Sequence, residues 1–169
     1  MIKKIIPFLV VLSLVAIIVT IFLLVASQKQ MIVIKEGNID KVPLEMQLNR
    51  YQDSDCGMVI DDMDYVSQVV APTGKTWFFH DHGGFVNWLK DKEFKDEAVI
   101  WVMSLDTKRF IDAKIASYSL TDDTPMGYGF GAYEKKASTH VDFDTMRLRM
   151  LRGETLNNPR IRKQLLGNY

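Results

Sequence analysis

Residues 65–79, YVSQVVAPTGKTWFF, predict a β-hairpin. The segment from Tyr65 to Ala71 is typical of a strand, and the segment from Lys75 to Phe79 is typical of the strand that returns beside it. Between them, Pro72-Thr73-Gly74 combines the fixed φ of proline with the conformational freedom of glycine, which is the composition of a turn. The chain is therefore expected to contain a pair of antiparallel strands here.

A helix and a further strand are expected directly after this hairpin. Phe85, Trp88 and Leu89 are spaced i, i+3 and i+4, so a helix that starts near His82 presents them on one apolar face. The nearly all-apolar run over 98–103 then predicts a short strand that is buried on both faces.

Four other segments extend this pattern over the rest of the chain. Apolar and polar residues alternate over 44–49 with the period of a half-buried strand. Residues 110–120 are expected to be extended, and Tyr128 and Phe130 alternate with glycines, as in a strand that another backbone approaches closely. Residues 142–152 suit a helix. The order strand-strand-helix, given twice, predicts an α+β fold in which helices pack on an antiparallel sheet.

The first segment of the chain predicts a membrane anchor. Residues 5–26 carry no charge, and about 20 apolar residues in a helix cross a hydrocarbon core of roughly 30 Å. Lys3 and Lys4 precede this run and favour an N-terminus that stays in the cytoplasm. Cleavage of the segment as a signal peptide after Ala26 is the alternative, although the apolar run is longer than a signal peptide needs. Either route exports the rest of the chain.

The chain is accordingly divided into three parts. We expect a transmembrane anchor over 1–27 in the inner membrane, a tether over 28–42 and a periplasmic α+β domain over 43–169. The end of this domain, from residue 158 on, is expected to form a short basic helix.

The composition excludes some classes of protein. The 169 residues carry no net charge, whereas a protein that binds nucleic acid needs a basic surface, so no nucleic-acid partner is expected. The single cysteine cannot close a disulfide within the chain.

Soft side chains form the first candidate site. Asp55-Cys56-Gly57-Met58 offers a thiolate and a thioether, and soft ligands of this kind select Cu(I) over hard ions. A lone thiol in an oxidising compartment is a hazard unless it is buried or metal-bound. The alternative is a buried structural cysteine beside a core methionine.

A second methionine lies on a shaped loop. In Thr124-Pro125-Met126-Gly127, proline fixes the backbone before Met126 and glycine frees it afterwards, so this methionine does not belong to a helix stripe. Met126 is therefore a candidate copper ligand, and the alternative is a methionine that fills a gap under the loop.

Two histidines form the third candidate site. If the strand continues through His80-Asp81-His82, the two imidazoles point to one face, and imidazole suits copper or zinc. The alternative is that Asp81 or His82 caps the helix that follows. Cys56 with His80 is also a possible nucleophile and base pair.

Several short motifs follow one another in a specific order between residues 53 and 150. They are Cys56-Gly57-Met58, Gln68-Val69-Val70, Gly74-Lys75-Thr76, Phe78-Phe79, Gly83, Trp101-Val102, Phe110-Ile111-Asp112-Ala113, Ser117-Tyr118, Thr124-Pro125-Met126-Gly127 and Phe130. Each motif alone is common, but the ordered set resembles the NosL family of accessory proteins.

The resemblance implies a function, a fold and a set of partners. It implies a copper chaperone, not an enzyme, which helps to assemble the copper centre of nitrous oxide reductase. It also implies a fold related to that of the organomercurial lyase, and docking on a membrane ABC-type assembly complex in the periplasm. Carried over by motif, Cys56 matches the family's cysteine, Met58 the methionine of Cys-Gly-Met and Met126 the methionine of the Pro-Met-Gly loop. Our hypothesis is that Cu(I) bridges the two halves of the domain through Cys56 and Met126.

Three features depart from the family's pattern. Many members are lipoproteins, whereas this chain is expected to use a helical anchor. Many have a second cysteine where this chain has Asp53, and paired aspartates where it has His80-Asp81. The third ligand is therefore left open between His80 and His82. Two other functions also stay open: a structural or assembly protein of the envelope without metal, and a thiol-dependent lyase.

Overall fold

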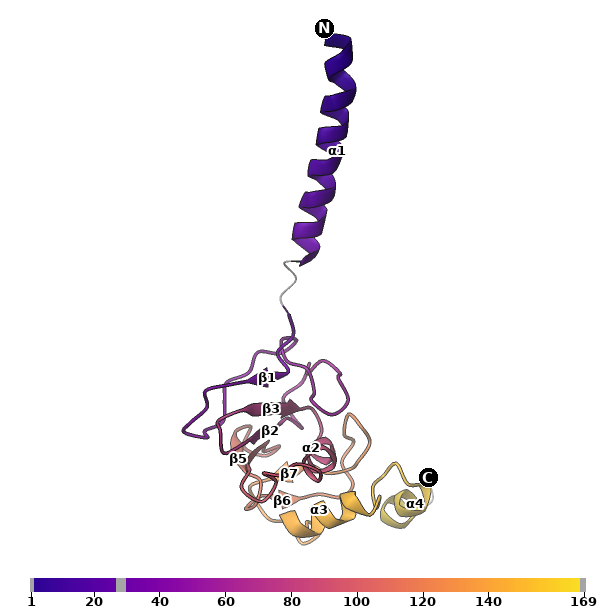
Figure 1. The fold of residues 1–169 in the computed structure, drawn as a ribbon. Helices are drawn as coiled ribbons and strands as arrows, with labels where there is room; N and C mark the ends of the chain where they lie inside the picture. The colour runs from indigo at the N-terminus through magenta and orange to yellow at the C-terminus, as the bar shows by residue number, and fades with distance from the viewer. Residues whose placement is uncertain (1, 27–29, 168–169) are drawn as a thin grey trace. The chain divides into compact units, whose positions relative to one another are not determined.

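The computed structural model describes residues 2–26 and 30–167, and it divides at Gln30 into two units (Figure 1). The first unit contains the helix α1 (Ile2–Ala26), whose described side chains are exposed. Within the described residues, no helix has both the length and the hydropathy needed to cross a membrane. The single span over 1–27 therefore stays a prediction, and the junction at residues 27–29, where the tether was expected to begin, lies outside the described residues.

The predicted hairpin forms and lies inside the second unit. Strands β2 (Ser67–Val70) and β3 (Thr76–Phe79) are antiparallel, with Val70 opposite Thr76 and Ser67 opposite Phe79. The turn needs a glycine at residue 74 because φ is +82° there, and a Cβ would meet the backbone of Asn38 at 2.9 Å.

A five-stranded antiparallel sheet grows outward from this hairpin. Its order is β1-β3-β2-β4-β5, where β1 is Ile34–Lys35, β4 is Val99–Met103 and β5 is Phe110–Asp112. A separate two-stranded sheet pairs β6 (Ser117–Tyr118) with β7 (Ala132–Tyr133). The structure therefore confirms the α+β class with an antiparallel sheet.

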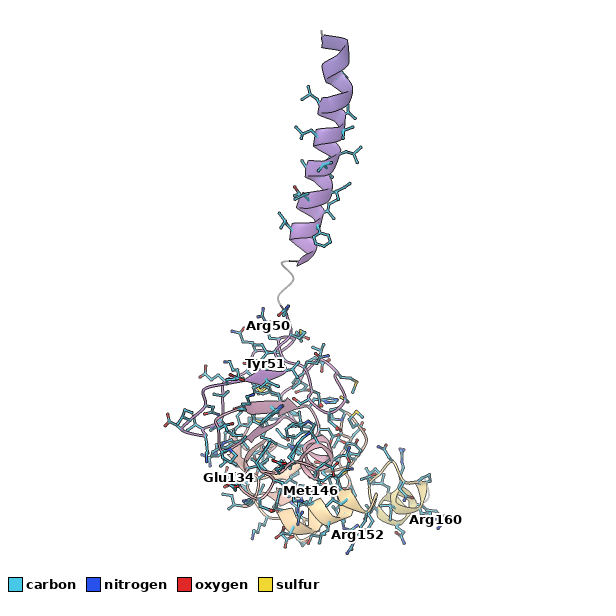
Figure 2. The ribbon with its side chains drawn as sticks, viewed as in Figure 1. Arg50, Tyr51, Glu134, Met146, Arg152 and Arg160 are labelled. Atoms are coloured by element: carbon cyan, nitrogen blue, oxygen red, sulfur yellow. The ribbon has the colours of Figure 1, made fainter. Side chains whose placement is uncertain are left out.

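Two helices pack together beside the sheet and close the main core. They are α2 (His82–Leu89) and α3 (Phe143–Leu151), and Phe85 and Phe143 stack between them with ring centroids 6.4 Å apart. Met146 of α3 is fully buried in this core, and Tyr51 belongs to a second, smaller cluster (Figure 2). The basic helix predicted near the C-terminus forms as α4 (Pro159–Leu166).

Some predicted elements differ from the structure. The alternating segment 44–49 is not a strand, because the side chain of Gln68 pairs with both the N–H and the C=O of Leu44, in place of a neighbouring strand. Residues 110–120 break into β5 and β6 at the turn that follows Asp112. From Met31 on, the segment expected to be a tether belongs to the folded unit, because β1 pairs with β3.

The glycine-rich segment near residue 128 also differs in part. Residues 128–130 are not a strand, and the strand β7 begins at Ala132 instead. The close backbone approach that the glycines predicted is present, since a Cβ on Gly129 would lie 2.7 Å from the carbonyl oxygen of Leu120.

Candidate metal centre

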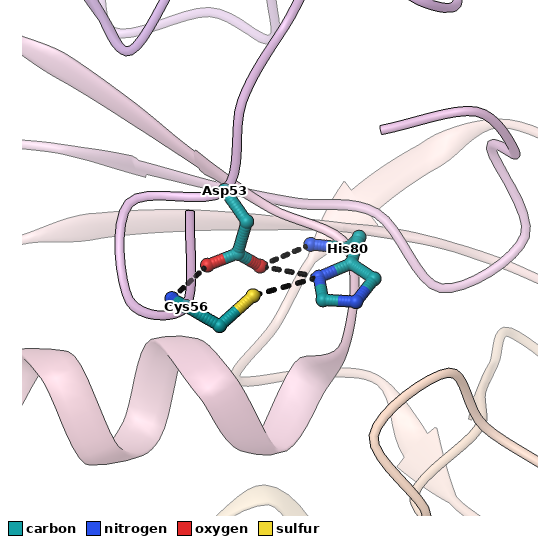
Figure 3. A group of neighbouring side chains, drawn as sticks. All are labelled: Asp53, Cys56 and His80. Carbon is teal, nitrogen blue, oxygen red and sulfur yellow. Dashed lines mark hydrogen bonds and ion pairs between the residues drawn. The ribbon is translucent and has the colours of Figure 1, made fainter. Parts of the chain in front are cut away.

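Three side chains from two segments converge at one end of β3. Asp53, Cys56 and His80 each offer one metal-ligand atom, and these atoms lie within 4.8 Å of one another (Figure 3). Cys56 Sγ is 3.8 Å from Nδ1 of His80, and Oδ2 of Asp53 is 2.6 Å from the same nitrogen. The structure thus brings together two of the predicted site residues, Cys56 and His80, and adds Asp53.

Asp53 organises the loop that carries the cysteine. Its Oδ1 accepts hydrogen bonds from the backbone amides of Asp55 at 2.7 Å and Cys56 at 3.0 Å. The loop then reverses at Gly57, where φ is +76°, and the amide of Asp53 donates to the carbonyl of Met58. Local hydrogen bonding of this kind is what favours aspartate in turns.

The same carboxylate also fixes the histidine. His80 directly follows β3, and both its backbone N–H, at 2.8 Å, and its Nδ1 donate to Oδ2 of Asp53. The other ring nitrogen, Nε2, is buried and has no hydrogen-bond partner among the described residues. Since Nδ1 donates its proton to Asp53, a neutral His80 has its lone pair on Nε2.

Burial and hydrogen bonding oppose each other in this pair. Burial by itself would raise the pKa of Asp53, but the hydrogen bonds from His80, Cys56 and Asp55 bring it below its ordinary value. Burial by itself would lower the pKa of His80, but the hydrogen bond and the negative charge of Asp53 bring it above its ordinary value. The pair is therefore stabilised as an ion pair or as a strong hydrogen bond.

The thiol of Cys56 is held in its protonated form. The residue is exposed as a whole, but partial burial of the sulfur raises the pKa of the thiol, and the charges of Asp53 and Asp55 raise it further against a backbone hydrogen bond from Met58. Activated cysteines need the opposite environment, with a lowered pKa.

The geometry also argues against a nucleophilic relay. In a cysteine–histidine–carboxylate relay the thiol and the carboxylate contact different nitrogens of the imidazole. Here Cys56 Sγ and Asp53 Oδ2 both lie at Nδ1 of His80. The arrangement suits shared coordination of a cation by a sulfur and a nitrogen better than proton transfer along a chain.

Met126 lies on a loop that is tied to the same region. The amide of Met126 donates to Oδ2 of Asp81 at 2.9 Å, and its carbonyl accepts from Asn157. Asp81 is the N-cap of α2 and follows His80 directly, so the structure confirms the capping alternative. The loop turns at Gly127, where φ is +67°. The side chain of Met126 is half-buried.

The other two candidate ligands lie apart from the three-residue cluster. Met58 is 44% exposed, next to the loop glycine. His82 is fully buried between the rings of Tyr65 and Tyr118, and its Nδ1 is 2.7 Å from the hydroxyl of Ser67. Burial lowers the pKa of His82 to about 3. His80 and His82 do not share a face, because β3 ends at Phe79 and the helix begins at His82.

Asp53 is the site residue that the sequence patterns do not indicate. In the sequence it is notable only because it stands where many members of the resembled family have a second cysteine. A usable signal was its spacing, because an aspartate two or three residues before other amides can accept hydrogen bonds from them and shape a tight loop.

A cleft of about 340 Å³ lies beside His80. The residues that line it come from His80 itself, from the loop after Ile60 and from the loop before Met126. They are Asp61, Asp62, Tyr65, His80, Asp123, Thr124 and Pro125. The methionine loop and the histidine therefore face a common space.

A comparison with solved structures finds similarity of structure to a copper chaperone. The crystal structure of the copper chaperone NosL from Shewanella denitrificans is similar to this chain with a TM-score of 0.48 and 16% sequence identity, over 64% of this chain and 89% of that chain. No family model matches the chain. No curated protein matches it either.

Proposed function

We propose that this protein is a Cu(I)-binding metallochaperone, in which Cys56 provides a thiolate and His80 an imidazole to the ion. The observation that carries the proposal is the 3.8 Å separation between Cys56 Sγ and Nδ1 of His80, beside the carboxylate of Asp53. Thiolate and imidazole are ligands that copper and zinc accept, and a thioether nearby shifts the preference toward Cu(I).

The donor atoms fit a single ion. Metal–sulfur and metal–nitrogen bonds are about 2.3 Å and about 2.0 Å long, so two such donors on one ion lie at most roughly 4.3 Å apart. The observed 3.8 Å falls inside this limit. Binding through Nδ1 would displace the proton that His80 shares with Asp53, and the carboxylate would then partly neutralise the charge of the ion.

The two methionines supply the remaining soft ligand in this proposal. Met126 is the stronger candidate, because its backbone amide is hydrogen-bonded to the side chain of Asp81, the residue that directly follows His80 in the sequence. Met58 is exposed and follows the cysteine loop, where it can close over an ion or meet a partner protein. Few ligands and an exposed thiol allow a partner to add its own ligand before the chaperone releases the ion.

The location and the partners rest on the sequence alone. We propose a single N-terminal span in the inner membrane, on the basis of the uncharged run over 5–26, with the domain in the periplasm. The ordered motifs that resemble the NosL family support nitrous oxide reductase as the client and an ABC-type membrane complex as the docking partner.

An enzymatic role is not part of the proposal. A thiol-dependent lyase of the organomercurial type uses two thiols, and the sequence contains one cysteine. The raised pKa of Cys56 also disfavours nucleophilic attack by the thiolate.

The test is a Cu(I) titration of the full chain in detergent, under anaerobic conditions, against a chelator of known affinity. We expect one bound equivalent, a loss of at least about 100-fold in affinity in Cys56→Ser and a loss of about tenfold in Met126→Ile. Met150→Ile, a change on α3 outside the cluster, is the matched control and should leave the affinity unchanged. Equal affinities in the wild type, Cys56→Ser and Met126→Ile would refute the proposal and favour a structural protein of the envelope.

A further inference from the structure

A cavity of about 180 Å³ opens between α2 and α3, the two helices that close the main core. Leu89 and Lys90 line it from α2, and Phe143, Arg147 and Leu151 line it from α3. The three residues of α3 are spaced i, i+4 and i+8, so they lie along one face of that helix. We call this space the helix cavity. None of the residues that line it belongs to the candidate metal centre.

The size of the helix cavity limits what can fill it. Its apolar lining runs from Leu89 and Phe143, which are less than one-tenth exposed, to Leu151, which is 42% exposed. An apolar cavity of about 150 Å³ holds one benzene molecule, whereas pockets that enclose whole drug-sized ligands measure at least about 300 Å³. The helix cavity therefore has room for one aromatic ring or one branched apolar side chain, and the rest of its occupant must lie outside.

Positive charge surrounds the opening. The cationic residues that line the helix cavity are Lys90, Lys95, Lys114 and Arg147. They outnumber the two carboxylates there, those of Asp96 and Asp144, although the whole chain carries no net charge. Among the described residues the three lysines form no ion pair, and Arg147 has only a contact of 3.8 Å with Asp144. The charge of this rim is therefore complementary to an anionic partner.

The helix cavity and the loop of Cys56 flank the same helix. A Cβ on Gly84 of α2 would lie 3.9 Å from Oδ2 of Asp55, next to the cysteine. Burial raises the pKa of Asp55, and the positive charge of Lys90, which lines the cavity, opposes this rise. A standard interface covers about 800 Å² on each partner, which is roughly 30 Å across, and a helix is about 10 Å wide. A protein seated over the cavity therefore also reaches the surface beside Cys56.

We propose that the helix cavity is a docking site for an acidic segment of a partner protein. The segment inserts one aromatic or branched apolar side chain between α2 and α3 and places its carboxylates on the cationic rim. A single anchor in a pocket, surrounded by complementary charge, is the usual arrangement of a binding hot spot. The docking needs no metal; only the use of such a partner for copper exchange with Cys56 rests on the function proposed above.

The test uses the full chain in nanodiscs of phosphatidylcholine, without copper and with the thiol reduced. The probe is a synthetic peptide, acetyl-EEFEE-amide, in which glutamates flank one phenylalanine. Methyl NMR should show saturable shifts of Leu89 and Leu151, and the affinity should fall as the salt concentration rises. Peptides with glutamine in place of glutamate, or alanine in place of phenylalanine, should bind at least about tenfold more weakly.

A pair of charge variants separates the rim from general electrostatic attraction. Lys95→Glu combined with Lys114→Glu should weaken binding of the peptide at least about tenfold. Lys135→Glu combined with Lys136→Glu makes the same change in net charge at exposed lysines outside the cavity. This control should alter the affinity by less than about twofold, because distant surface charges are screened by salt.

A pair of apolar variants tests the anchor. Leu151→Glu places a carboxylate in the wall of the cavity and should abolish saturable binding. Leu148→Glu is the matched control, because Leu148 is 43% exposed on the same helix but does not line the cavity. Far-UV circular dichroism of each variant checks that the fold is retained.

Absence of saturable binding, or equal losses in the test and control variants of folded protein, would overturn the docking site. The same methyl shifts on adding phosphatidylglycerol to the nanodiscs in place of the peptide would make a lipid the occupant. Self-association that Leu151→Glu removes would make it a second copy of the chain, and either result would also overturn the acidic segment. The Cu(I) titration of the wild type is unaffected by any of these results.

Discussion

Oδ2 of Asp81 accepts a hydrogen bond from the backbone amide of Met126 at 2.9 Å, across 45 positions of the sequence. Its other oxygen, Oδ1, accepts the amide of Gly83 and caps α2. One buried carboxylate thereby joins the start of a helix in the first half of the domain to the methionine loop of the second half. This contact places the loop beside His80.

Removal of that carboxylate should weaken both the fold and the copper site. For Asp81→Ala we expect a loss of about 1–2 kcal/mol in the free energy of unfolding, because the helix cap and the bond to the loop are both lost. Urea denaturation measures the loss. Asp142→Ala removes the exposed cap of α3, which holds no distant loop, and should cost less while Cu(I) affinity is kept. Equal effects of the two variants on Cu(I) affinity would contradict the positioning role of Asp81.

Copper affinity should rise with pH. The thiol of Cys56 has a raised pKa and is protonated at neutral pH, so Cu(I) must displace its proton. Below that pKa the affinity should increase at least about tenfold for each unit of pH, because the thiol releases one proton for each ion bound, and it should increase more steeply at pH values where His80 is also protonated. Competition titrations between about pH 6.5 and about pH 8.5 measure the slope, and pH-independent affinity would show that the thiolate is not the ligand.

The pair of Asp53 and His80 should give the fold its own dependence on pH. The pKa of Asp53 is lowered, so its contribution to stability is present above the ordinary value of 3.8 and is lost as the pH falls through its folded pKa. The pKa of His80 is raised, so its contribution is full below 6.5 and declines as the pH rises through its folded pKa.

Asp53→Asn tests this dependence. The variant should be less stable than the wild type by about 3 kcal/mol at about pH 5, where both charges are present. The difference should shrink at higher pH, where only a hydrogen bond to neutral His80 remains. Urea denaturation at several pH values gives the difference, and NMR should show that His80 titrates at a lower pH in the variant. An unchanged His80 titration would mean that the two groups do not interact in solution.

Two adjacent glycines should respond in opposite directions to alanine. A Cβ on Gly83 would meet the ring of Tyr128 at 2.3 Å, so Gly83→Ala should cost about 1–3 kcal/mol by overpacking. A Cβ on Gly84 meets nothing closer than 3.9 Å, and alanine is the better helix former, so Gly84→Ala should be neutral or stabilising. Thermal unfolding of both variants compares them directly. A Gly83→Ala variant as stable as Gly84→Ala would show that Tyr128 does not pack on the helix start.

Much of the scaffold was predictable because it depends on local patterns. The hairpin around Pro72-Thr73-Gly74, the helix that starts at His82 and the buried strand ending at Met103 all follow from turn composition, apolar spacing and run length. The prediction of a strand over 44–49 was wrong for a physical reason. The backbone N–H and C=O of Leu44, at the start of the segment, pair with the side chain of Gln68, a partner 24 positions away that no periodicity reveals.

The sequence by itself determined the α+β class, the uncharged N-terminal run and the set of soft side chains, because these depend on composition and on spacing between near neighbours. The tertiary structure alone decided which histidine joins Cys56. His80 and His82 are equivalent in the sequence, but the end of β3 at Phe79 directs one toward Asp53 and buries the other against Ser67. A side chain becomes a ligand through the direction in which it points, and that direction is set by packing between segments that are distant along the chain.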